Sequence, residues 1–209
     1  MTPNGDDVSS YDVLDRALGV QPGDRLDRLR SARAETRRNA QLSYEAIFEP
    51  AAPNGVSVTE RFALAVVISR WHGRTPLSAH YEAEFTRREP QPEMIQALND
   101  IVGAGEATGP YGEYREEGLA AESMPGLRFE VPASARGLLG DELSALIEHV
   151  HLLVFRPREA SAEALQRLLD EGWTSTDIVC VSQLVAFLAF QIRYANGLAV
   201  LAETEEVAA

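Results

Sequence analysis

The sequence predicts an all-α protein, and three observations support this class. Apolar residues recur at intervals of three and four along most of the 209 residues, which is the period of a helix that buries one face. Serine, threonine or aspartate precedes these stretches and glycine or proline follows them, as at helix starts and ends. The strict alternation of apolar and polar residues that marks a half-buried strand is nearly absent. We therefore expect residues 1–209 to form a single all-helical domain.

Cap residues define the expected helices of the first half. Ser57-Val58-Thr59-Glu60 is a capping box, in which the serine oxygen accepts a backbone hydrogen bond and the glutamate reaches back to the helix start. Thr75-Pro76 opens the next helix, because proline is tolerated in a first turn. Ser10 is expected to cap a short helix that Gly19 ends, within an otherwise loose segment of residues 1–23. The helices of this half are expected at 11–18, 25–48, 61–72, 76–88 and 92–103.

Residues 107–132 interrupt the helical pattern. They are rich in glycine and proline and have no apolar period, so we expect a long loop or insertion with short turns that joins two helical halves. In the second half, Thr174-Ser175-Thr176-Asp177 repeats the arrangement of residues 57–60: a capping sequence that ends in an acid precedes a nearly all-apolar helix. The helices of this half are expected at 141–155, 162–171 and 178–202.

The charged residues exclude several kinds of chemistry. All 19 basic residues are arginine, so a Schiff base, a phosphate-loop lysine and a lysine general base are excluded. Against them stand 32 acidic residues, which give a formal net charge of -13. Binding to phosphate backbones needs a concentrated positive surface, so we expect no nucleic-acid partner.

Cysteine usage and hydropathy indicate a cytoplasmic protein. The only cysteine is Cys180, which excludes an internal disulfide and fits a reducing compartment. The N-terminal residues 1–11 are polar and acidic and do not resemble a signal peptide. The longest apolar run, Ile178 to Ile192, contains polar residues and is shorter than the roughly 20 residues of a membrane span. We expect no membrane partner.

Metal and thiol sites are weakly indicated. His149 and His151 are two apart in a stretch expected to be helical, so they point about 200° apart and cannot share a metal. No third ligand stands at a recognisable spacing, and we expect neither a metal nor a cofactor. Cys180 lies between two valines near a helix start. A position near a helix N-terminus can lower the pKa of a thiol, but the apolar neighbours favour an inert core cysteine.

The only basic cluster occupies the first half. Six arginines are interleaved with three acids, and helical spacing allows local ion pairs such as Asp24 with Arg28 and Asp27 with Arg30. We interpret this cluster as a solvated or subunit-contacting face. Its arginines are Arg25, Arg28, Arg30, Arg33, Arg37 and Arg38.

The strongest candidate site combines Glu60 with His80. Glu60 lies roughly 18 Å along its helix from His72, at about 1.5 Å per residue. If the helix after Gly73 runs back alongside this one, His80 lies about 12 Å back toward Glu60. A carboxylate beside an imidazole is a reasonable acid/base pair, which His72 and Tyr81 would assist by orienting or donating. The alternative is that Glu60 only caps its helix and His80 only makes a core hydrogen bond.

Two segments of the sequence resemble a known superfamily. Gly172-Trp173-Thr174-Ser175-Thr176-Asp177-Ile178 and residues 185–198 resemble the C-terminal helices of peroxidase-related proteins in the carboxymuconolactone decarboxylase and alkylhydroperoxidase D superfamily. Residues 145–171 match the same pattern of helix, proline-containing turn and helix. Thr59-Glu60-Arg61 and the stretch to His80 are similar to its core segment, where a glutamate opens a helix and a CxxC pair with a histidine lies at the next.

The resemblance covers about residues 33–201. It implies an alkylhydroperoxidase D-like helical bundle that assembles as a homo-oligomer, with a small-molecule site between helices near subunit contacts.

The departures from the superfamily pattern concern its reactive thiols. If His80 is placed on the superfamily histidine, Gly73 and Pro76 stand where the two cysteines would fall. The spacing from Glu60 to His80 is also one residue longer than in the superfamily. Neither glycine nor proline can act as a peroxidatic or resolving group, so dithiol peroxidase activity is not expected. The decarboxylase branch of the superfamily works without the cysteine pair, which keeps an enzyme in consideration.

Three hypotheses follow. The first is a thiol-independent enzyme in which Glu60 and His80 do acid/base work on a small molecule. The second is a degenerate, non-catalytic member that acts as a binding or assembly protein. The third is a one-cysteine peroxidase that uses Cys180, although a thiol in an apolar helix should ionise poorly.

Overall fold

A computed structural model describes residues 12–203, and within them the chain is helical without an extended strand. The predicted all-α class is confirmed. The first half contains α1 (Val13–Leu18), α2 (Arg25–Ser31), α3 (Ala34–Phe48), α4 (Val58–Trp71), α5 (Pro76–Thr86) and α6 (Pro92–Ala104). The second half contains α7 (Ala133–Leu139), α8 (Asp141–Phe155), α9 (Ala162–Asp170) and α10 (Ser175–Glu203); the 3₁₀ turns η1 (Glu117–Glu122) and η2 (Pro157–Glu159) lie in the connections.

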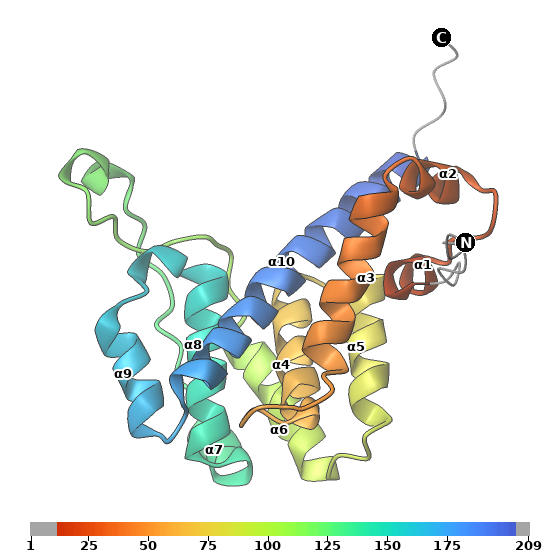
Figure 1. The fold of residues 1–209 in the computed structure, drawn as a ribbon. Helices are drawn as coiled ribbons and strands as arrows, with labels where there is room; N and C mark the ends of the chain where they lie inside the picture. The colour runs from red at the N-terminus through yellow and green to blue at the C-terminus, as the bar shows by residue number, and fades with distance from the viewer. Residues whose placement is uncertain (1–11, 204–209) are drawn as a thin grey trace, which may run out of the picture.

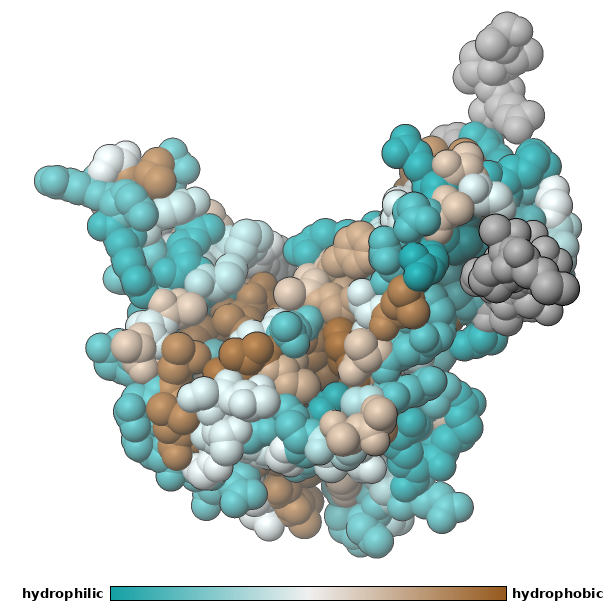
Figure 2. Space-filling view, viewed as in Figure 1, coloured by the Kyte–Doolittle hydropathy of each residue, from teal (hydrophilic) through white to brown (hydrophobic). Residues whose placement is uncertain are grey.

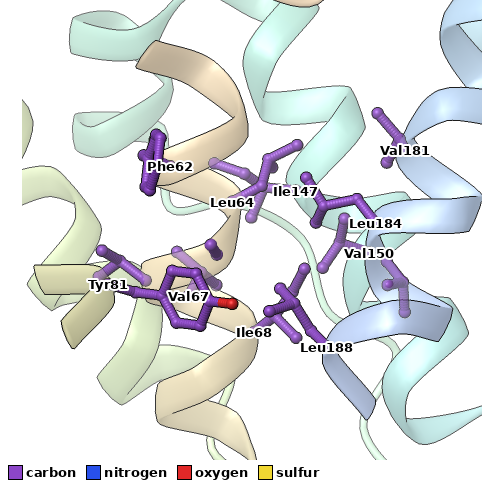
Figure 3. Close-up of a cluster of buried hydrophobic side chains, with 14 of the residues drawn as sticks. Phe62, Leu64, Val67, Ile68, Tyr81, Ile147, Val150, Val181, Leu184 and Leu188 are labelled. Atoms are coloured by element: carbon purple, nitrogen blue, oxygen red, sulfur yellow. The ribbon is translucent and has the colours of Figure 1, made fainter. Parts of the chain in front are cut away.

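Helices α4, α8 and α10 meet at the centre of the core (Figures 1 and 3). Helix α4 is apolar on nearly every side, and its residues from Arg61 to Ser69 are all buried, because α5, α6, α8 and α10 surround it. Figure 3 shows side chains of the three central helices pointing toward one another. Such burial on all sides explains why α4 has no polar face. The labelled contacts come from Leu64 and Ile68 of α4, Ile147 and Val150 of α8, and Val181, Leu184 and Leu188 of α10.

Both capping sequences form as predicted. Ser57 Oγ accepts from the backbone N–H of Glu60, and a carboxylate oxygen of Glu60 accepts from the backbone N–H of Ser57 at 2.7 Å. Asp177 accepts in the same way from the backbone N–H of Thr174 at 3.0 Å. Asp177 also accepts from the backbone N–H of Gly55 at 2.8 Å, so the start of α10 is tied to the loop before α4. The predicted Ser10 cap lies outside the described residues, and α1 has Asp12 as its N-cap.

The predicted helix over 25–48 is wrong at one place. The helix is interrupted at Ala32 and Arg33, which separate α2 from α3. The break sets the two helices against each other, so that Arg30 from α2 and Arg37 from α3 both reach Asp15 of α1. No glycine or proline marks the break and the apolar period continues through it, so the sequence has no local signal for it.

The interpretation of the basic cluster as a solvated face is also wrong for Arg30. This side chain is fully buried and pairs with Asp12 and Asp15 rather than with Asp27. Asp27 instead pairs with Arg37 at 3.0 Å. Arginine can enter a core where two carboxylates accept hydrogen bonds from its guanidinium.

Residues 107–132 form an irregular arm with η1 near its tip, as the composition predicts (Figure 1). A single bridge between Gly112 and Met124 closes the arm, and Phe129 and Val131 are buried at its end. The short helix α7 follows at once and was not predicted. It starts after Pro132 and ends at Gly140, whose positive φ of 82° favours glycine.

Helix α10 crosses the face of the molecule seen in Figure 1. Apolar side chains gather on the middle of this face (Figure 2), and Val179 and Phe190 of α10 are 56% and 46% exposed. Within the described part of the chain, α10 is the helix long and apolar enough to cross a membrane by length and composition. Half of its most apolar window is buried in the protein.

Candidate functional site

Glu60 is held at the start of α4. Its carboxylate accepts from the backbone N–H of Ser57 at 2.7 Å and from the hydroxyl of the same residue at 2.6 Å. Glu60 also lines an open groove of about 850 Å³, where the start of α4 meets Met94 of α6 and the chain between Leu139 and Leu143. Its hydrogen bonds are those of a capping group.

His72 closes the other end of α4. Its Nδ1–H donates to the carbonyl oxygen of Ile68 at 2.9 Å, one turn back in the same helix. Burial lowers the pKa of His72, which keeps the imidazole neutral at pH 7. This hydrogen bond gives His72 a structural role at the helix end, where it is the C-cap residue.

His80 of α5 faces α3. Its Nε2 lies 3.2 Å from the hydroxyl of Tyr44, and its ring packs 5.8 Å from the Tyr44 ring. Burial lowers the pKa of His80 to about 4, which outweighs the opposing effect of Glu84. Burial also raises the pKa of Tyr44, so both partners are neutral at pH 7.

Tyr81, next to His80, points into the core. Its hydroxyl donates to Oε1 of Gln191 in α10 at 2.5 Å, and neither side chain is more than 1% exposed. Burial raises the pKa of Tyr81 well above its ordinary value. This hydrogen bond explains why a glutamine occupies the otherwise apolar centre of α10.

The structure therefore brings together only part of the predicted site. His80 and Tyr81 are in ring contact at 5.1 Å. Glu60 bonds to Ser57 and His72 to Ile68, and among the described residues no hydrogen bond or ring contact joins either of them to His80. The described contacts of Glu60 and His80 are those of the alternative set out from the sequence: a helix cap and a hydrogen-bonded histidine.

Cys180 is less enclosed than its apolar neighbours suggest. The thiol residue is half-buried, and Val179 beside it is largely exposed, whereas Val181 is buried. The sequence analysis favoured an inert core cysteine; Cys180 instead lies at the edge of the core, where α10 turns one face outward.

His149 and His151 lie on α8, and the helical conformation predicted for them is confirmed. His151 is enclosed by the rings of Trp71, Phe129 and Phe155, and its Nε2–H donates to the carbonyl oxygen of Gly105 at 3.0 Å. His149 points to a different neighbour, as expected for positions two apart on a helix. Its side chain lines a cavity of about 610 Å³ beside α9.

This cavity, which we call the α8–α9 cavity, lies between two helices that Figure 1 shows side by side, and residues 128–130 of the arm form a further wall. His149 is only 5% exposed, and neither of its ring nitrogens has a hydrogen-bond partner. Burial, and after it the charge of Arg167, lowers the pKa of His149 to about 4. The neutral ring therefore offers one donor and one acceptor.

Unpartnered polar groups are costly in a protein interior, and most buried ones have a partner. Nε of Arg156, which also lines the α8–α9 cavity, is likewise buried without a partner. Two such groups beside one cavity indicate a place for a ligand. The sequence marked His149 only as a failed metal ligand. The available signal was the small residue Ala145, which lies one turn earlier on the same face of α8 and leaves room beside the ring.

No protein-family model matches the chain, and neither the curated proteins nor the solved structures contain a match.

Proposed function

We propose that this chain is a non-catalytic, small-molecule-binding member of the carboxymuconolactone decarboxylase and alkylhydroperoxidase D-like superfamily. The observation that carries the proposal is the α8–α9 cavity with the unpartnered ring of His149 in its wall. The absence of a CxxC pair from the sequence supports the loss of dithiol chemistry. The capping role of Glu60 supports the loss of its predicted catalytic role.

The test uses the four histidines of the chain as reporters. Protein labelled with ¹³C in the histidine rings is screened by NMR against a library of small neutral and charged compounds. Each signal is assigned from single variants. We expect bound compounds to shift the His149 ring while His72 and His80 stay unchanged. If no compound in the library shifts His149, the proposal is wrong.

The acid/base enzyme is the second candidate, and one observation favours it. The neutral imidazole of His80 lies 3.2 Å from the hydroxyl of Tyr44, and a neutral imidazole can act as a general base. The wild type and the His80→Ala variant are compared on lactones and β-keto acids. Turnover by the wild type that the variant lacks would establish the enzyme, whereas no turnover by either protein supports the binding protein.

A one-cysteine peroxidase is tested separately. Cys180 is half-buried on α10 and is the only thiol in the sequence. Under our proposal the wild type does not consume peroxide. Consumption that disappears in the Cys180→Ser variant would instead establish the peroxidase.

The homo-oligomer that the resemblance implies is part of the proposal. Exposed apolar side chains on α10, among them Val179, Phe190 and Val200, support an assembly that covers them. Light scattering coupled to gel filtration tests it, and a monomer at micromolar concentration would contradict it. The net charge of -13 supports the absence of a nucleic-acid partner, and the single cysteine supports a cytoplasmic location.

A further inference from the structure

In the wall of the α8–α9 cavity, most polar groups without a hydrogen-bond partner are donors. His149 supplies one N–H, and Arg156 supplies its buried Nε–H. Arg167 also lines the cavity, and its guanidinium has no hydrogen bond or ion pair within the described residues. Arg167 is close enough to His149 for its charge to lower the pKa of that ring. An acceptor group that carries negative charge is the partner that such donors prefer.

The other arginines of the cavity are already paired, which makes Arg167 distinctive. Arg136 donates to Glu148 at 2.5 Å and to Asp141 at 3.1 Å. Arg128 lies 3.4 Å from Glu159, and Nη1 of Arg156 donates to Glu159 at 2.7 Å. A ligand therefore meets one free guanidinium rather than four.

The acidic residues around the cavity limit the charge of a ligand. Six carboxylates line it beside four guanidiniums, so the walls as a whole repel a polyanion. A phosphate ester or nucleotide would bring two or more negative charges against this surface. A single carboxylate brings one charge, which Arg167 can neutralise while His149 donates to one of its oxygens.

Apolar side chains form the rest of the wall. Phe129 of the arm, Leu152 of α8 and Leu168 of α9 are buried beside the cavity, and Ala145 and Ala164 leave room between the helices. A volume of about 610 Å³ lies within the range of small-molecule pockets. The ligand is thus expected to have an apolar body in addition to its charged group.

We propose that the α8–α9 cavity binds a small organic monocarboxylate, with the carboxylate at His149 and Arg167 and an apolar body against Phe129, Leu152 and Leu168. This inference rests on the proposed function, and it adds the chemical class of the ligand. It assigns positioning of the ligand to Arg167, whose guanidinium has no hydrogen bond or ion pair within the described residues.

The experiment compares matched acids and amides. Butyrate, octanoate and 4-phenylbutyrate are titrated beside butanamide, octanamide and 4-phenylbutanamide, and the ring signals of His149 report binding. We expect at least one acid to shift His149 and to bind ten-fold or more tightly than its amide, because charge-assisted hydrogen bonds to Arg167 are lost in the amide. In the Arg167→Gln variant, the acid should bind about ten-fold more weakly while the amide is unaffected.

Two controls separate this effect from folding and from net charge. Arg167 is exposed, so its replacement should leave the thermal unfolding midpoint unchanged. The Arg38→Gln variant makes the same change in net charge on the exposed surface of α3, away from the cavity, and should bind the acid as the wild type does.

The outcomes distinguish the two proposals. If compounds of the wider library shift His149 but no acid binds more tightly than its amide, the monocarboxylate is wrong and the binding function stands. If no compound shifts His149, both are wrong. If the acids bind the wild type and the Arg167→Gln variant equally, the role of Arg167 is overturned.

Discussion

Arg30 and Asp12 form a buried, two-pronged ion pair that fastens α2 to the start of α1. Nη1 and Nη2 of Arg30 donate to the two carboxylate oxygens of Asp12 at 2.8 and 2.7 Å. Burial by itself would raise the pKa of Asp12, but the hydrogen bonds from Arg30 and from the backbone of Asp15 lower it. The same carboxylate caps α1. Asp12 thus fixes both the start of α1 and the position of α2 against it.

The Asp12→Asn variant isolates the charge of this pair. Asparagine is as good an N-cap as aspartate, so the cap survives while Arg30 is left as a buried cation with half of its partners. We expect the free energy of unfolding to fall by about 3–5 kcal/mol, as for buried pairs that lose one member. Urea denaturation at pH 7 measures it. The matched control is Glu35→Gln, which removes an exposed pair with Arg38 and should change stability little; an equal loss in both variants would refute the prediction.

This ion pair also shows what limited the prediction of the fold. Signals within four residues were sufficient for the caps at Ser57 and Thr174 and for the stop at Gly19, whose φ of 67° is left-handed. The break at Ala32 has no such local signal, because it depends on Asp12 and Asp15 in another helix. Tertiary contacts therefore decided where local propensity did not.

For the candidate site, too, the sequence predicted local conformation but not tertiary neighbours. Helical spacing gave the conformation around His149 and the divergence of His149 from His151. It could not give the neighbour that each ring faces, since that depends on how α9 and the arm dock on α8. The proposed pairing of Glu60 with His80 assumed that antiparallel helices suffice to join two side chains, but α4 and α5 turn these residues toward different neighbours.

The hydrogen bond between Tyr81 and Gln191 should stabilise the packing of α5 on α10. Tyr81→Phe removes the donor and leaves a buried amide oxygen of Gln191 without it, so we expect a loss of about 1–3 kcal/mol in the free energy of unfolding. The Tyr81→Phe/Gln191→Leu double variant removes both polar groups and should recover part of that loss. A double variant less stable than Tyr81→Phe would contradict this account.

Acid should destabilise the protein before its carboxylates are protonated. Burial lowers the pKa values of His80, His149 and His151 to about 4, whereas an unfolded histidine titrates near 6.5. Between these values the unfolded chain binds more protons than the folded one, so stability is full above about pH 6.5 and falls as the pH falls toward 4. Urea midpoints measured from pH 8 to pH 4 should decrease steadily.

The His151→Gln variant provides the control for this pH dependence, because glutamine has no titrating group. We expect a lower stability at pH 8, since the contacts of His151 with Trp71 and Phe129 are lost, but a shallower decrease between pH 6.5 and 4. His151 accounts for about 3 kcal/mol of the pH-dependent change if its pKa moves by the full difference. Parallel curves for the variant and the wild type would show that His151 does not contribute.

The closeness of His149 and Arg167 can be measured without any ligand. The pKa of His149 is lowered first by burial and then by the positive charge of Arg167, which opposes protonation of the ring. In the Arg167→Gln variant the pKa should rise from about 4 but stay below the ordinary value of 6.5, because the burial is unchanged. An NMR titration of the His149 ring signal in the apo protein gives both values. The Arg38→Gln variant should match the wild type, and a pKa of His149 that Arg167→Gln leaves unchanged would place the guanidinium too far away to share a ligand with this ring.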